Sequence, residues 1–248
     1  MKNILDFKNY DSWIHKFNNL YQKQDDYKII LNDFINNVDC NSLDNFVENI
    51  SEEIKNFLMQ NYSHVVFYHA SATDNINSYL NNGIFPSSVE SRIDFARKLF
   101  NQEEYPEITD TLFDNAKNKY LKDKNYISLS EGKIYLVLDD NILKEEGSSH
   151  YACYGGEHLL CFTNHLGLRY KNILKDKLMP VIFKCKVPIE LVQDSLDDVA
   201  EAITVRFFEC MVYPKYKFSD ANSVPRISFK IEPNCILGCE FPKDLDCD

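Results

Sequence analysis

An apolar segment of this chain ends in a histidine and a serine, two residue types that can bind and position a polar substrate. The segment is Phe67-Tyr68-His69-Ala70-Ser71, and its aromatic and β-branched surroundings predict a strand. The end of a strand holds polar side chains rigidly at the rim of a cleft, where an imidazole and a hydroxyl can bind the hydroxyl groups of a ligand. The alternative is a half-buried histidine whose hydrogen bonds are satisfied within the fold, and the spacing alone favours it.

A second cluster of chemically capable residues occupies positions 150–158. Two adjacent glycines there, in a chain with only 7 Gly, let the backbone approach a ligand closely or turn sharply into a helix. Glu157 follows in the first turn of a predicted helix, where its carboxylate either serves a substrate or complements the helix dipole. Both interpretations stay open. The polar and glycine residues of this cluster are His150, Tyr151, Tyr154, Gly155, Gly156, Glu157 and His158.

The same segment contains a cysteine–histidine pattern formed by Cys153, His158, Cys161 and His165. Three of these residues lie on one face of the predicted helix, whereas structural zinc sites more often use short pairs of ligands held by turns. We therefore expect no bound metal. Cys153, which lies near His150, is also a candidate nucleophile, although no family-specific motif surrounds it.

The composition is that of a globular protein, since 44% of the 248 residues are hydrophobic. No segment approaches the roughly 18 apolar residues that a membrane span needs, and charges interrupt the first residues, so we expect a cytoplasmic protein without a membrane partner. The 8 cysteines are then expected to be reduced. The net charge of -11 does not favour a nucleic-acid partner, because phosphate binding relies on clustered cations.

Apolar periodicity predicts helices early in the chain and strands later, which indicates an α+β fold. Residues 1–62 are expected to form a helical N-terminal layer, packed on a mixed or antiparallel sheet within residues 63–248. We expect one continuous globular unit, because no linker rich in Pro or Gly follows the layer. Strands are predicted over 64–69, 133–138, 180–187, 226–231 and 235–241. Helices are predicted over 26–38, 42–62, 74–82 with Thr73 as its cap and Gly83 at its end, 88–100, 107–121, 157–167 and 195–213.

The stretch YHASATDNINSYLNNGIFPSS resembles the opening of the ADP-ribosyltransferase fold, as in its PARP-like and DarT-like branches. There a strand ends in a His followed by a small residue and a hydroxyl residue, and a helix then ends in a turn with Gly before a hydrophobic residue. The segment KIYLVL is similar to the second strand of that family, and the region that both segments span covers about a third of the chain. The matching residues are His69, Ser71, Tyr79, Gly83 and Ile84, followed by Ile134, Tyr135 and Leu136.

The resemblance implies a reaction, the transfer of ADP-ribose from NAD. In that family the first-strand His hydrogen-bonds the NAD ribose, an aromatic residue stacks on the nicotinamide, and a Glu stabilises the oxocarbenium ion. His69 takes the first role, supported by Ser71, and Tyr135 is the second-strand aromatic, with Tyr151 or Tyr154 as rivals. The residues expected to be catalytic are Glu157, His69 and Tyr154, and those expected to bind NAD are His69, Ser71, Tyr79, Tyr135, Tyr151, Gly155 and Gly156.

The glutamate is the point at which the chain departs from the family pattern. The family usually carries it on a strand near the C-terminus, whereas Glu157 follows soon after the second strand and lies on a predicted helix. Its Tyr-Gly-Gly context favours Glu157, and the late candidates are Glu209, Glu232 and Glu240.

Three functions follow from these residues. The first is an ADP-ribosyltransferase that uses NAD as its substrate and needs no metal, such as a bacterial toxin or a phage-defence effector acting on a protein or nucleic acid. The second is a non-catalytic module on the same fold that binds a ligand or a partner protein. The third is a hydrolase or nuclease built on the cluster from His150 to His158.

Overall fold

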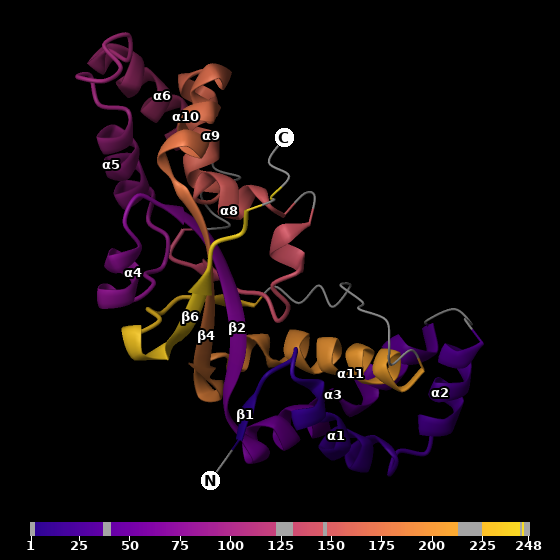
Figure 1. Ribbon diagram of the computed structural model, residues 1–248. Coiled ribbons are helices and arrows are strands. Elements are labelled where there is room, and N and C mark those ends of the chain that lie inside the picture. The colour runs from indigo at the N-terminus through magenta and orange to yellow at the C-terminus, as the bar shows by residue number, and fades with distance from the viewer. Residues whose placement is uncertain are drawn as a thin grey trace. The chain divides into compact units, whose positions relative to one another are not determined.

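A computed structural model describes residues 3–36, 41–122, 131–145, 148–212, 225–243 and 245 (Figure 1). Helices and strands both contribute, and the fold class is α+β as predicted. The chain divides into two compact units that alternate along the sequence. The first unit comprises Met1–Tyr68, Leu136–Ile142 and Lys186–Pro225, and the second comprises His69–Tyr135, Leu143–Cys185 and Arg226–Asp248. Strands β2 (Tyr62–Thr73) and β4 (Met179–Pro188) each run from one unit into the other.

The first unit is mainly helical. Helix α11 packs against α2 and α3, as Figure 1 shows. The helices predicted over 26–38, 42–62 and 195–213 are confirmed as α2, α3 and α11. The elements of this unit are β1 (Asn3–Leu5), η1 (Tyr10–Ser12), α1 (Ile14–Tyr21), α2 (Tyr27–Ile35), α3 (Asn41–Asn61), η4 (Ile189–Leu191), η5 (Gln193–Ser195) and α11 (Leu196–Val212).

Aromatic side chains fill the core of the first unit. The Tyr21 ring lies 4.7 Å from Phe207 and 5.9 Å from Phe208, measured between ring centroids. Edge-to-face and offset contacts at these distances stabilise a core beyond the apolar area that they bury. The Tyr21 hydroxyl lies 2.8 Å from Thr204 Oγ1, so its polar end is satisfied inside this core.

Strand β1 lies within the region predicted as purely helical. It pairs in parallel with β2, with Ile4 opposite His64 and Leu5 opposite Val65. The prediction for residues 1–62 is wrong at this point, because a strand of three residues is too short to show the alternating pattern that identifies strands.

The larger sheet has the strand order β1-β2-β4-β6 and is mixed, as predicted. β6 (Ile236–Glu240) pairs antiparallel with β4, and Phe183 is opposite Cys239. A second sheet contains only β3 (Ile134–Tyr135) and β5 (Arg226–Ile227), which pair antiparallel. The strands predicted over 133–138 and 226–231 are therefore too long, because the chain leaves this pairing after Tyr135 and Val137 then bridges Tyr68.

The second unit surrounds its strands with short helices. Helix α9 packs against α5 and α6, and the core between them includes Phe113 and Phe162, whose ring centroids lie 4.9 Å apart. The helices of this unit are α4 (Ile76–Asn82), α5 (Val89–Leu99), α6 (Asp110–Lys122), α8 (His150–Tyr154), α9 (Glu157–Leu166), η3 (Leu168–Tyr170), α10 (Lys171–Lys177) and η6 (Pro233–Cys235), while η2 (Ile142–Lys144) begins in the first unit.

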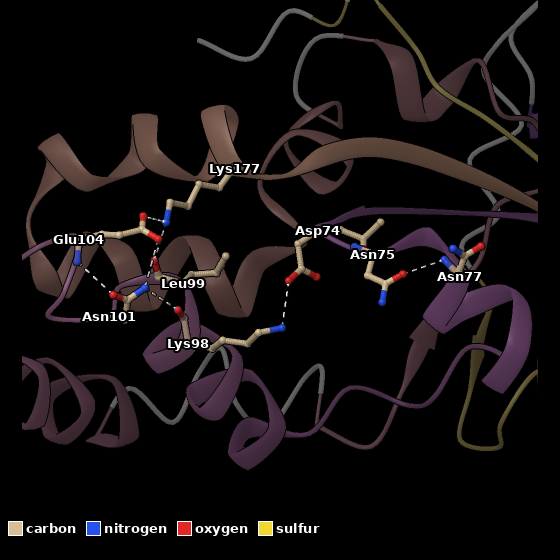
Figure 2. Close-up of polar contacts among 9 residues, drawn as sticks. Asp74, Asn75, Asn77, Lys98, Leu99, Asn101, Glu104 and Lys177 are labelled. Carbon is tan, nitrogen blue, oxygen red and sulfur yellow. Dashed lines mark hydrogen bonds and ion pairs between the residues drawn. The ribbon is translucent and has the colours of Figure 1, made fainter.

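The turn around α4 differs from its prediction in one residue. Asn75, and not Thr73, caps the helix, because its side chain accepts a hydrogen bond from the Asn77 backbone (Figure 2). Gly83 ends the helix with a φ of 82°, as predicted. A Cβ at Gly83 would collide with the carbonyl oxygen of Ile231, so this position requires glycine.

Within the described residues, no helix combines the length and the apolar character that crossing a membrane requires.

Candidate functional site

His69 is oriented by a backbone carbonyl. Its Nδ1 lies 2.9 Å from the carbonyl oxygen of Tyr135, 66 positions later in the chain. A carbonyl oxygen only accepts hydrogen bonds, so Nδ1 carries the proton and Nε2 presents a lone pair. The imidazole also stacks on Phe183, with ring centroids 6.5 Å apart and planes 19° apart. The histidine is therefore held as an acceptor of fixed orientation.

The environment keeps His69 uncharged at neutral pH. Burial lowers the pKa of the imidazole to about 4, the nearby Arg92 guanidinium lowers it further, and the hydrogen bond to the Tyr135 carbonyl opposes this decrease. At pH 7 the ring is thus neutral, and Nε2 is free to accept a hydrogen bond from a ligand hydroxyl.

Ser71 and Tyr79 belong to the same group as His69. The Ser71 and Tyr79 hydroxyl oxygens lie 3.0 Å apart. Positions 69 and 71 share one face of β2, because successive side chains of a strand alternate. The Tyr79 ring lies 4.8 Å from Phe183, which thus contacts both predicted residues, His69 and Tyr79. We call these four residues the His69 group.

Glu157 is the centre of a second group. The Tyr151 hydroxyl donates a hydrogen bond to Glu157 Oε1 at 3.1 Å, and His150 Nε2 lies 4.0 Å from the same oxygen. The Glu157 side chain is 36% exposed, so its carboxylate is accessible to a ligand.

Tyr135 connects the two groups. Its carbonyl oxygen accepts the hydrogen bond from His69. The pKa of its phenol is raised by burial, lowered by the Arg226 cation and raised by the negative charge of Glu157. Arg226 lies over the Tyr135 ring, 5.2 Å from its centroid. Burial and then Glu157 also raise the pKa of Tyr151, with a smaller contribution from Tyr135. Both phenols therefore stay protonated at neutral pH and act as hydrogen-bond donors.

The two glycines predicted to bind NAD, Gly155 and Gly156, form a turn of the backbone. Gly155 and Gly156 have φ angles of 74° and 97°, and they form the sharp turn between α8 and α9. This turn places Glu157 at the first position of α9, as predicted. A Cβ at Gly155 would lie 3.3 Å from the Ala72 carbonyl oxygen, so close packing against β2 also favours glycine there.

Tyr154 is positioned differently from the other predicted tyrosines. It is only 1% exposed and belongs to the core cluster of the second unit. The Lys171 ammonium lies 4.7 Å from its ring centroid. Since its ring is enclosed by protein, we favour Tyr135 over Tyr154 as the aromatic residue of the site.

The alternative glutamates are all held in ion pairs. Glu209 is buried in α11 and lies 3.3 Å from Arg206. Glu232 lies 2.7 Å from Lys230, and Glu240 of β6 pairs with Lys144. Glu157 instead contacts a tyrosine and a histidine, Tyr151 and His150, which leaves its charge less compensated.

The cysteine–histidine pattern of residues 153–165 has structural roles. Cys153 is 1% exposed and disulfide-bonded, so its sulfur is available neither as a nucleophile nor as a metal ligand. His158 is buried and hydrogen-bonded to Tyr120. Among the described residues, no three His, Cys, Asp or Glu side chains are arranged to hold a metal ion.

The expectation of reduced cysteines is correct for some positions and wrong for Cys153. Among the residues that the structure describes, Cys185, Cys210, Cys235 and Cys239 have free thiols. Chain length and the lack of an export signal predict the usual state of the thiols in a protein. They do not predict which pair of sulfur atoms the fold brings together.

A pocket of about 480 Å³ lies beside His69, within the second unit. It is lined by the end of β2, by α4 and the turn after it, and by one face of α5 from Ser91 to Lys98, together with Lys133 and Ile134. Its cations, Arg92, Lys98 and Lys133, are not among the site residues predicted from the sequence, and neither are Phe183 and Arg226. The scarcity of arginine was a usable signal, since only five occur in the chain and two of them, Arg92 and Arg226, lie near predicted site residues.

Comparison with known protein families, with curated proteins and with solved structures finds no match to this chain.

Proposed function

We propose that this protein transfers ADP-ribose from NAD to a protein or nucleic-acid acceptor. One observation carries the proposal: His69, Tyr135 and Glu157 form a linked set, through the Tyr135 carbonyl on one side and the charge of Glu157 on the other. The resemblance to ADP-ribosyltransferases selects His69 and Tyr135, and the Tyr-Gly-Gly context selects Glu157.

The His69 group suits the binding of a ribose. Neutral Nε2 of His69 accepts a hydrogen bond from a ribose hydroxyl, and the buried Ser71 hydroxyl is bonded to Tyr79 next to it. Tyr135 offers its ring to the nicotinamide, a flat and positively charged ring that stacks on aromatic side chains.

Glu157 would act on the bond that breaks. The bond between ribose C1′ and the nicotinamide nitrogen cleaves, its electron pair goes to nicotinamide, and positive charge develops on the ribose ring. The acceptor then forms a bond to C1′ with its own lone pair and loses a proton to solvent. A carboxylate near the ring stabilises the developing charge, and the Tyr151 hydroxyl holds Glu157 Oε1 in place. Arg226 opposes this effect, so the distance of its guanidinium from the ribose matters.

Nicotinamide release from NAD tests the proposal. The wild-type protein is incubated with NAD, first alone and then with mixed protein or nucleic-acid acceptors, and free nicotinamide is measured by chromatography. Glu157→Gln keeps the shape of the side chain and removes its charge, so the rate should fall by about 10²-fold, the scale of lost transition-state electrostatics. The matched control is Glu103→Gln, an exposed glutamate of the same unit, which should keep the wild-type rate.

Two results would contradict the proposal. Equal rates in Glu157→Gln and wild type would remove Glu157 from the reaction. Binding of NAD by the wild type without nicotinamide release, with either class of acceptor, would instead support the non-catalytic binding module. We do not propose the hydrolase or nuclease, since His158 is buried against Tyr120 while His150 faces Glu157.

A further inference from the structure

The pocket beside His69 has a positive charge that the acidic chain as a whole does not predict. Among the described residues that line it, three are cations, namely Arg92, Lys98 and Lys133, and one, Asp74, is a carboxylate. The full chain carries a net charge of -11. A pocket that collects cations in such a chain attracts anions locally, because it focuses a field of opposite sign to the surface around it.

One of the three cations is already neutralised. Lys98 Nζ lies 3.2 Å from Asp74 Oδ2, and Figure 2 shows this lysine reaching from α5 to the carboxylate. Arg92 and Lys133 form no ion pair with any residue in the part of the chain that the structure describes. The pocket therefore keeps two uncompensated positive charges.

Ser87 contacts the Arg92 side chain and the Lys133 backbone at the pocket wall. The Arg92 Nε donates to Ser87 Oγ at 3.4 Å, and the Ser87 backbone N–H donates to the Lys133 carbonyl at 3.0 Å. The Arg92 Nε bond leaves its two terminal nitrogens available as a pair of donors. Arg92 and Lys133 come from different segments, so they can each bind a separate anionic group of one ligand.

We infer that this pocket binds a ligand with a diphosphate group, of the size of a nucleotide. Its volume of about 480 Å³ lies within the range typical of small-molecule sites. The side chains of Asn75, Asn82 and Ser91 add neutral hydrogen-bonding groups to the lining, and the exposed Phe85 adds an aromatic surface. A diphosphate, with two anionic groups, matches two cations from separate segments better than a single carboxylate does. This inference requires no cleavage of NAD.

Calorimetric titration of the purified protein tests the inference with four probes: pyrophosphate, ADP, NAD and adenosine. Pyrophosphate and ADP should bind, adenosine should bind much more weakly, and added salt should weaken the binding of pyrophosphate. Tighter binding of NAD than of ADP would identify the dinucleotide as the source of the diphosphate, and the reverse order would identify a nucleoside diphosphate.

Variants that change one charge each make the test specific. Arg92→Gln and Lys133→Gln should each weaken pyrophosphate binding by about tenfold, the cost of one charge-assisted contact. Lys119→Gln removes the same charge from an exposed position on α6 outside the pocket lining, and it should leave the affinity within about twofold of wild type. Asp74→Asn frees Lys98 and should tighten binding, a change of opposite sign.

The inference would be overturned by an absence of pyrophosphate and ADP binding in the wild type. Equal affinities for the wild type, Arg92→Gln and Lys133→Gln would also overturn it, provided that circular dichroism shows all three folded. If the wild type binds pyrophosphate through Arg92 and Lys133 but releases no nicotinamide from NAD, the pocket assignment stands and the proposed reaction alone fails.

Discussion

In two places a tyrosine hydroxyl is hydrogen-bonded to a serine or threonine hydroxyl, with nearly equal O···O distances but in contrasting environments. Tyr21 and Thr204 of the first unit lie 2.8 Å apart, and Tyr79 and Ser71 of the second unit lie 3.0 Å apart. Tyr21 is 0% exposed and surrounded by phenylalanine rings, whereas Tyr79 is half-buried and lines the pocket beside His69. The first pair is enclosed by its core, and the second can exchange its partner for a ligand.

Lys8 of the first unit and two cations of the second unit, Arg92 and Lys133, differ in the same way. Lys8 of the first unit lies 3.6 Å from Asp139 and also pairs with Asp140, and both carboxylates are buried. Arg92 and Lys133 of the second unit line a pocket in which Asp74, the carboxylate among its described lining residues, is paired with Lys98. Residue type alone therefore does not distinguish structural from functional polar groups in this chain. What separates them is whether the protein itself completes the interaction.

The largest expected effect comes from the aromatic core of the first unit. Phe207→Ala removes a fully buried ring that contacts Tyr21, and it should lower the free energy of unfolding by about 3–5 kcal/mol. Urea denaturation at pH 7 measures this change. The matched control is Phe85→Ala at the pocket of the second unit, where the ring is 57% exposed, and the loss should be about 0.5 kcal/mol or less. Similar losses in both variants would contradict the contrast between an enclosed and an open aromatic environment.

The next effect is the pH dependence that His69 imposes on stability. Folding lowers its pKa to about 4 from the value of about 6.5 in an unfolded chain, so the folded state disfavours the proton. Above pH 6.5 neither state binds this proton, so His69 has no effect on the free energy of unfolding. As the pH falls from 6.5 to 4 the unfolded chain binds the proton and the folded protein does not, so the free energy of unfolding decreases. Below pH 4 both states bind it, and the loss stays constant. The maximal loss is up to about 3 kcal/mol.

Urea denaturation at pH 7 and at pH 4.5 measures the contribution of His69. His69→Gln should lose less stability than the wild type between these values, because it has no group that titrates there. His15→Gln, at an exposed position of α1, should behave like the wild type. An identical pH dependence in all three proteins would show that His69 is not held in its neutral form.

The sequence predicted the helices well and the site in part. Periodicity over ten or more residues identified α3, α9 and α11, whereas β1 and β3 are too short for an alternating pattern to appear. His69, Ser71 and Tyr79 were found together because one strand and the next helix carry all three. Arg92, Lys133 and Phe183 were missed, since only tertiary packing brings them to the same place.

The smallest expected effect is the loss of stability when the tyrosine hydroxyl of each pair is removed. Thr204 Oγ1 donates its only proton to the Ala200 carbonyl at 2.7 Å, so Tyr21 must be the donor in the Tyr21–Thr204 bond. Tyr21→Phe removes that donor inside a core that water does not reach, and it should cost about 1 kcal/mol in the free energy of unfolding. Activity should be unchanged, because the pair belongs to the first unit and not to the His69 group.

Tyr79→Phe makes the same chemical change where the environment is open. Water from the pocket can replace the lost hydroxyl next to Ser71, so the loss of stability should be about 0.5 kcal/mol or less. The cost should appear in substrate binding instead, as a rise of about fivefold in the KM for NAD, which corresponds to one neutral hydrogen bond. Nicotinamide release and urea denaturation of both variants give the four values needed. If Tyr79→Phe loses as much stability as Tyr21→Phe and keeps its KM, the Ser71–Tyr79 pair is as enclosed as the core pair, and the His69 group is then a structural feature of the second unit.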